Sequence, residues 1–180
     1  MYRVTTAICA HFSHHVRGHV GPCISVHGHT WKFELTLEAR ELDQEGFVVD
    51  FDVVHDRVLV PTHRLLDHSF AVGEVTYSET GATLAELGRT LVASRREVLG
   101  HLGTPPFHLE GELAGARNEL PGGIKVAVFP FAPTSERLAE WFFGVAHTKL
   151  ANERVQVAST RVYESLLPVP AFAEYAREPI

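Results

Sequence analysis

Residues 30–39 alternate between apolar and polar side chains without a break. The apolar positions are Trp31, Phe33, Leu35 and Leu37, and the polar positions are Lys32, Glu34, Thr36 and Glu38. Successive side chains of a strand point to opposite faces, so this pattern predicts a β-strand with one buried face. The chain therefore contains a sheet that packs a core against one side.

The sequence His27-Gly28-His29 stands directly before this strand and ends a run of six histidines in nineteen residues, which begins at His11. Period two places His27 and His29 on one face. With a third imidazole from another strand they make a three-histidine site with an open coordination position, the pattern of catalytic zinc. The alternative is a histidine-rich solvated loop that binds nothing.

The third histidine is expected from residues 2–10, an apolar and β-branched run that predicts a strand, with His11 closing it. Residues 12–26 read as a polar loop that contains His14, His15 and His19. These loop histidines could compete as ligands. We favour His11, because a position held by a sheet presents a ligand more reproducibly than a loop does.

The two cysteines, Cys9 and Cys23, give a candidate reactive thiol. The N-terminus lacks a basic region followed by a long apolar stretch, which is the pattern of a signal peptide, so we expect a cytoplasmic protein. A disulfide between the two cysteines is therefore disfavoured. Cys9 on the strand suits an inert buried thiol better than Cys23, which follows Gly21-Pro22. A thiolate that moves protons needs a partner. Asp67-His68 is a candidate, since a carboxylate can orient an imidazole, although such pairs also arise by chance.

Further elements follow from periodicity and from turn residues. We predict helices at 52–60, ending at Pro61, at 83–99 and at 134–150, the last capped by Thr134 or Ser135. Strands are expected at 47–51, 124–131 and 154–164, and an extended loop at 103–123. Pro168 and Pro170 restrict any closing strand to a short one or to an edge.

Composition limits the class of protein. A chain of 180 residues that is 45% hydrophobic suits one domain, residues 1–180. A net charge of -6 argues against a general nucleic-acid binder, and no apolar run is long enough for a membrane helix. No glycine-rich dinucleotide or phosphate fingerprint occurs, so no nicotinamide or flavin is expected.

Six short blocks occur in an order that resembles one enzyme family. They are Ala10-His11, Cys23-x-x-x-His27-Gly28-His29, residues 46–51 (GFVVDF), Leu66-Asp67-His68, residues 133–136 (PTSE) and residues 162–165 (VYES). Together they resemble the 6-pyruvoyltetrahydropterin and 6-carboxytetrahydropterin synthase family. The three residues between Cys23 and His27 are similar to its bacterial 6-carboxy branch.

The resemblance implies a role for each matching residue. It makes His11, His27 and His29 the Zn²⁺ ligands, and Cys23, Asp67 and His68 the catalytic residues. It makes Glu164 the carboxylate that binds the pterin's N–H edge. The implied reaction converts 7,8-dihydroneopterin triphosphate to 6-carboxy-5,6,7,8-tetrahydropterin, acetaldehyde and triphosphate, as a carbon-carbon lyase on the route to 7-deazapurines such as queuosine.

Two other functions stay open: a pyruvoyl-type or aldolase-like reaction on a related dihydropterin, and a non-catalytic zinc and pterin-binding scaffold. The implied fold is the α+β tunnelling fold, an antiparallel sheet with two or three helices on one face. Its subunits assemble into a β-barrel, commonly as a hexamer. About sixty residues separate Asp67-His68 from residues 133–136, so we expect an insertion at about 71–130.

Overall fold

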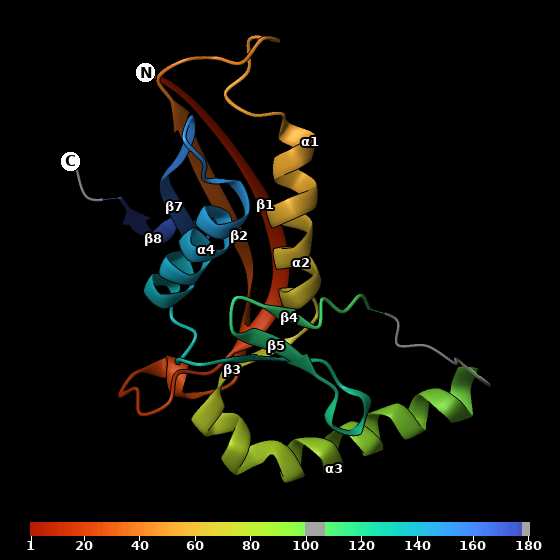
Figure 1. Cartoon of the computed structure of the whole chain (residues 1–180). Coiled ribbons are helices and arrows are strands. Elements are labelled where there is room, and N and C mark those ends of the chain that lie inside the picture. Colours follow the sequence, from red (N-terminus) through yellow and green to blue (C-terminus); the bar gives the residue numbers. More distant parts are fainter. Residues whose placement is uncertain (100–106, 178–180) are drawn as a thin grey trace. The chain divides into compact units, whose positions relative to one another are not determined.

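The computed structural model describes residues 1–99 and 107–177 (Figure 1). The chain forms two compact units built from interleaved segments. Unit 1 comprises residues 1–10, 29–63 and 134–180, and unit 2 comprises residues 11–28 and 64–133. The single domain with an insertion at about 71–130 stays a prediction.

Unit 1 contains a sheet in the order β1-β2-β7-β8. Its strands are β1 (Tyr2–His14, the first nine residues in this unit), β2 (His27–Ala39), β7 (Val155–Ser165) and β8 (Ala171–Ala176). β7 pairs antiparallel with both β2 and β8. The predicted strands at 30–39 and 154–164 are confirmed. β8 has six residues and is an edge strand, as the prolines before it require.

The buried face of β2 is the apolar set that the sequence alternation predicts. Trp31, Phe33 and Leu35 are fully buried. Helix α4 (Ser135–Leu150) lies over β7, and its Phe142 meets Phe33 edge to face with ring centroids 5.4 Å apart (Figure 1). Burial of such side chains contributes about 1.5–3 kcal/mol each. The predicted helix at 134–150 and its Thr134 cap are confirmed, because the Thr134 hydroxyl accepts a hydrogen bond from the backbone N–H of Arg137.

The helix that was predicted to end at Pro61 instead continues through it. It begins as α1 (Phe51–Val54), widens into a π turn (His55–Leu59) and continues as α2 (Val60–Leu66). Proline lacks an N–H and clashes with the carbonyl four residues before it, and a wider turn directly upstream relieves that clash. Residues 47–50 form no strand, so the prediction for 47–51 is wrong; Asp50 instead caps α1.

Unit 2 contains strands in the order β4-β5-β6-β3, followed by the end of β1. These are β3 (Phe70–Gly73), β4 (Glu112–Leu113), β5 (Ala116–Glu119) and β6 (Val126–Phe129). β3 runs parallel to both β1 and β6, so the sheet is mixed and not wholly antiparallel as predicted. β4, β5 and a 3-10 turn, η3 (Pro121–Gly123), replace the loop predicted at 103–123, of which residues 103–106 lie outside the described residues.

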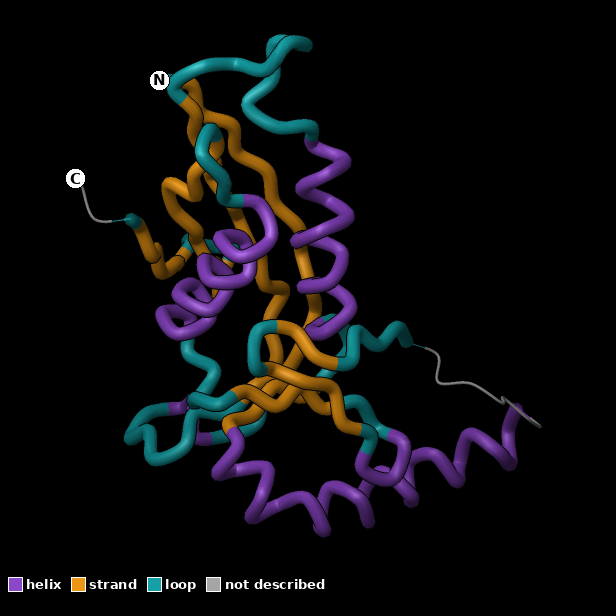
Figure 2. Tube along the Cα trace, in the orientation of Figure 1, coloured by secondary structure: helices purple, strands orange, loops and turns teal. Residues whose placement is uncertain are grey.

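Helix α3 (Glu74–Leu99) begins nine residues before the predicted start at residue 83 and packs on η3 (Figure 2). The contact requires glycine: a Cβ at Gly88 would lie 2.3 Å from the Pro121 carbonyl oxygen, and one at Gly122 would lie 2.1 Å from that of Ala85. Across the described residues, no helix combines the length and apolarity that a membrane span requires.

Candidate functional site

The start of β2 presents two imidazoles on one face. β2 begins at His27, earlier than the predicted residue 30, so His27 and His29 are both strand residues and share the face of buried Trp31. The His29 ring contacts Trp31 edge to face, with centroids 5.5 Å apart. The predicted common orientation of His27 and His29 is confirmed.

His14 ends β1, is 1% exposed and faces His27. The Nε2 atoms of the two rings are 3.0 Å apart. His14 Nδ1 is 3.0 Å from the Pro133 carbonyl oxygen, and His27 Nδ1 is 2.8 Å from that of Ser25. A carbonyl only accepts, so both Nδ1 atoms carry the proton and, in the neutral rings, both Nε2 lone pairs face each other. Two lone pairs at this distance repel unless a cation lies between them.

A second pair of possible ligands is His29 and Glu164. His29 Nε2 is 3.4 Å from a Glu164 carboxylate oxygen. His14, His27, His29 and Glu164 are a group of side chains that could hold a metal ion. Around a tetrahedral zinc, with bonds of about 2.0–2.1 Å, ligand atoms stand roughly 3.3 Å apart. Three imidazoles and a carboxylate are ligands that suit Zn²⁺, and the separations of 3.0 Å and 3.4 Å within the two pairs are close to that spacing.

This group contains His14, whereas the predicted ligand His11 lies outside it; the assignment of the ligands stays a prediction. β1 extends three residues beyond His11, which converts the expected loop position of His14 into a strand position. Along β1, Ala10, Phe12 and His14 are buried, whereas His11 is exposed. His11 and His14 therefore point to opposite faces. His15, the other competitor, places Nδ1 2.6 Å from the Ile24 carbonyl oxygen.

Glu164 was expected to bind the pterin, and the structure places it beside His29. The position serves either role, because a carboxylate there can bind the metal or accept hydrogen bonds from a substrate held next to the metal. The third histidine of the group, His14, lies on the same face of β1 as Ala10 and Phe12, and this spacing of two was the signal in the sequence for its face. Its second partner, the Pro133 carbonyl, comes from the block at residues 133–136.

Asp67 and His68 form the pair that the sequence predicts. Asp67 Oδ2 is 2.6 Å from His68 Nδ1, and Asp67 Oδ1 accepts a hydrogen bond from the backbone N–H of His11 at 2.9 Å. The His68 backbone N–H donates to the His11 carbonyl at 2.8 Å. The Asp67 side chain is 17% exposed and that of His68 is 69% exposed. An oriented imidazole whose far nitrogen is accessible suits proton transfer.

Cys23 lies in a 3-10 turn, η1 (Pro22–Ile24), in the same unit as Asp67 and His68. Its thiol is free and half-buried, and Cys9 is also free but exposed on β1. The Cys23 carbonyl accepts a hydrogen bond from the Val16 N–H at 2.9 Å, which closes the histidine-bearing loop. The more accessible thiol is thus Cys9, contrary to the expectation that Cys9 is buried.

Lys125 is a buried cation that was not predicted from the sequence. It is 4% exposed, and its Nζ donates to the carbonyls of Arg64 at 2.7 Å and Asp67 at 2.6 Å. Burial lowers the pKa of Lys125 from 10.5 to about 8, and the negative charge of Asp67 opposes that shift in part. A lysine inside the apolar run 124–131 was the signal in the sequence.

This pKa predicts a pH dependence of stability. Between pH 8 and 10.5 the unfolded chain keeps the Lys125 proton that the folded chain has lost, so the free energy of unfolding rises with pH in this window. Relative to Lys125→Met, whose side chain does not titrate, the wild type gains up to about 3 kcal/mol. Urea unfolding of both proteins at pH 7.5, 9 and 10.5 measures the difference. If the free energy of unfolding of the wild type relative to Lys125→Met stays constant or falls as the pH rises, the assigned pKa is contradicted.

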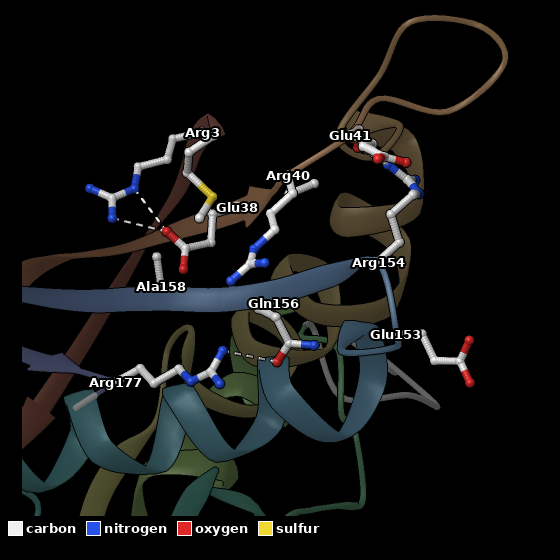
Figure 3. Close-up of a pocket in the computed structure, with 11 residues that line it drawn as sticks. Arg3, Glu38, Arg40, Glu41, Glu153, Arg154, Gln156, Ala158 and Arg177 are labelled. Atoms are coloured by element: carbon white, nitrogen blue, oxygen red, sulfur yellow. Dashed lines mark hydrogen bonds and ion pairs between the residues drawn. The ribbon is translucent and has the colours of Figure 1, made fainter. Parts of the chain in front are cut away.

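A cavity of about 840 Å³ lies elsewhere in unit 1, where charged side chains from β2 and β7 meet the start of β1 (Figure 3). Arg3 forms an ion pair with Glu38 at 2.9 Å, and Arg177 donates a hydrogen bond to the neutral amide of Gln156 at 3.3 Å. A small-molecule site usually has a largely apolar lining with few convergent polar groups. This mostly charged hollow is therefore not the candidate site.

Known proteins resemble this chain in sequence. The family model described as 6-pyruvoyl tetrahydropterin synthase matches residues 4–176. The 6-carboxy-5,6,7,8-tetrahydropterin synthase of Rickettsia bellii is 31% identical over 88 residues, which are 45% of this chain and 64% of that protein. The enzyme of the same name from Bacillus subtilis is 36% identical over 63 residues, 35% of this chain and 40% of that protein. The matched stretches span less than two thirds of these curated relatives.

Solved structures extend the likeness to nearly the whole chain. An uncharacterized protein of Wolinella succinogenes has a TM-score of 0.65 and 23% identity, and the match covers 98% of both chains. The 6-pyruvoyl tetrahydropterin synthase of Caenorhabditis elegans has a TM-score of 0.55 and 11% identity, covering 98% of this chain and 96% of that one. The predicted α+β tunnelling fold is thereby confirmed. With the family model matching residues 4–176, this chain belongs to the 6-pyruvoyl tetrahydropterin synthase family.

Proposed function

We propose that the protein is a zinc-dependent carbon-carbon lyase. It converts 7,8-dihydroneopterin triphosphate and water to 6-carboxy-5,6,7,8-tetrahydropterin, acetaldehyde and triphosphate, in the pathway to 7-deazapurines such as queuosine. The observation that carries the proposal is the His14–His27 contact, in which two imidazoles with carbonyl-bound Nδ1 atoms turn their Nε2 atoms toward each other at 3.0 Å. Relatives named 6-carboxy-5,6,7,8-tetrahydropterin synthase support the choice of product.

In this proposal His14, His27 and His29 hold the metal, with His14 replacing His11. Carbonyl partners on Nδ1 of His14 and His27 fix their tautomers, so that Nε2 is the atom in each ring that can coordinate a metal. Bound zinc supplies a Lewis acid that lowers the pKa of substrate hydroxyls. Glu164 accepts hydrogen bonds from the pterin's N–H edge and so orients the ring system beside that centre.

Two groups of the chain handle protons in this proposal. Asp67 accepts the His68 Nδ1–H, which leaves the accessible Nε2 to take or return a proton. Cys23 supplies the second proton-transfer group, as its thiolate or thiol. No external reductant is required, because the substrate side chain is oxidised as the ring is reduced.

The test is anaerobic incubation of the zinc-loaded protein with 7,8-dihydroneopterin triphosphate, with products identified by mass spectrometry. Carboxytetrahydropterin with acetaldehyde supports the proposal. A 6-pyruvoyl product assigns the protein to the pyruvoyl branch, which the name of the Caenorhabditis elegans structure makes the second candidate. Bound zinc without turnover of either kind favours the scaffold alternative.

Glu164→Gln separates the two roles open to this carboxylate. If Glu164 binds the pterin, the variant keeps one zinc per chain and its KM rises about tenfold or more, because a charged hydrogen-bond acceptor is worth roughly 1.5–3 kcal/mol. Zinc content by mass spectrometry and KM from initial rates measure the two effects. Loss of zinc from the variant identifies Glu164 as a metal ligand instead.

We also propose that the chain assembles into oligomers, with a hexamer expected from the family resemblance. β8 is an edge strand of six residues, and its Phe172 and Tyr175 are 48% and 41% exposed. An apolar sheet edge of this kind favours pairing with another strand. Light scattering at micromolar concentration measures the mass in solution, and a monomer there contradicts barrel assembly.

A further inference from the structure

Helix α2 ends directly before Asp67. The carbonyls of residues 64–67, at the C-terminus of the helix, all accept hydrogen bonds. Helix C-termini leave four carbonyls without partners inside the helix, and a glycine in the left-handed conformation commonly closes them. Here His68 takes that conformation, with a φ of +58°. A non-glycine residue there costs on the order of 1 kcal/mol or more and persists only where its surroundings hold it.

The donors that hold this turn come mostly from outside it. Lys125 Nζ donates to the carbonyls of Arg64 and Asp67 at 2.7 and 2.6 Å. Asn118 Nδ2 donates to the carbonyl between them in the helix, that of Leu65, at 2.9 Å. Only the Leu66 carbonyl is served locally, by the Ser69 N–H at 3.0 Å.

The two external donors, Asn118 and Lys125, lie in the segment between Asp67-His68 and the block at 133–136. Further hydrogen bonds hold each of them in place. The Asn118 side-chain oxygen accepts from the Glu110 N–H at 3.0 Å. The Lys125 carbonyl accepts from the Phe70 N–H at 3.0 Å, which extends the parallel pairing of β3 and β6. Lys125 also lies 5.9 Å from the centroid of the Phe107 ring. These contacts with Phe70 and Phe107 help to fix the position of the Lys125 ammonium group beside the turn.

We propose that Lys125 is a positioning residue for the Asp67–His68 pair, and that this brace is a purpose of the inserted segment. The proposal rests on the proposed role of the pair in proton transfer. An ammonium at a helix C-terminus is stabilised by the helix dipole, and two charge-assisted hydrogen bonds pull the carbonyls on either side of the turn together. His68 is thereby held in its left-handed conformation, with its ring against Asp67.

The test compares Lys125→Met with Lys149→Met, which makes the same change at an exposed lysine in the last turn of α4. In the zinc-loaded protein, Lys125→Met is expected to lower kcat about 10- to 100-fold with KM and zinc content unchanged, because a small misplacement of a proton-transfer group is enough for such a loss. Lys149→Met is expected to match the wild type. A normal kcat in Lys125→Met overturns the proposal.

Hydrogen exchange provides a readout that needs no substrate. The His68 and Ser69 amides, which donate to the carbonyls of His11 and Leu66, are expected to exchange faster in Lys125→Met, while β3 and β6 keep their protection. Equal loss of protection throughout unit 2 means a general structural role and overturns the proposal. If Lys125→Met does not fold, Lys125→Gln keeps a neutral NH₂ donor group in place of the ammonium and is expected to speed exchange of the same two amides relative to the wild type. Failure of the wild type to turn over any pterin rejects the proposed function, and the exchange data then still decide the positioning role.

Discussion

Replacing His14 with alanine is expected to remove the bound zinc and to reduce turnover to background, whereas His11→Ala keeps one zinc per chain. His14 is buried, its Nδ1 is tied to the Pro133 carbonyl, and its Nε2 stands 3.0 Å from that of His27. In the proposed site, loss of one of three imidazoles would leave too few nitrogen ligands to retain the metal against a chelator.

His11→Ala is the matched control, because it removes an imidazole three residues earlier on the same strand. The His11 backbone bonds Asp67 and His68, and the alanine variant keeps that backbone. Metal content after dialysis against a weak chelator, measured by elemental mass spectrometry, separates the two variants. Retention of zinc by His14→Ala together with its loss from His11→Ala would restore the sequence-based assignment.

Asp67→Asn is expected to lower kcat by about 10²- to 10⁴-fold while leaving zinc bound, the range typical of losing positioned acid–base catalysis. The amide oxygen can still accept the His11 N–H, but the amide nitrogen then faces His68 Nδ1 as a donor. His68 would have to accept there and carry its proton on Nε2, so the accessible nitrogen is no longer a base. In the Ser-His-Asp triad of serine proteases, replacing the aspartate with asparagine lowers kcat about 10⁴-fold for this reason.

The chain offers a control for this change in His55–Asp56, another adjacent pair, with a separation of 3.1 Å and an Asp56 side chain that is 78% exposed. Asp56→Asn is expected to leave kcat, KM and zinc content unchanged. Single-turnover rates at several pH values measure the loss in Asp67→Asn. A drop of less than about threefold would remove Asp67 from the proton-transfer step.

Much of the fold follows from local pattern. The alternation at residues 30–39 predicts both the strand and its buried face, and the apolar positions of residues 134–150 predict the helix that covers it. Pro61 shows where local rules stop: the proline predicts a helix end, yet a π turn formed before it lets the helix continue. The cost of the proline is offset by burial of Val58, Leu59 and Leu65, which no local rule includes.

The candidate site divides in the same way. The cluster of histidines, the shared face of His27 and His29, and the adjacency of Asp67 and His68 could all be predicted, because each depends only on spacing along one strand or one turn. The contact between His14 and His27 depends on long-range pairing, since the length of β1 is set by its pairing with β3. The tertiary structure also decided that Lys125 reaches the turn before His68. Contacts between residues far apart in the chain depend on which strands pair and in what register, and the side-chain pattern of a single strand carries no record of its partner.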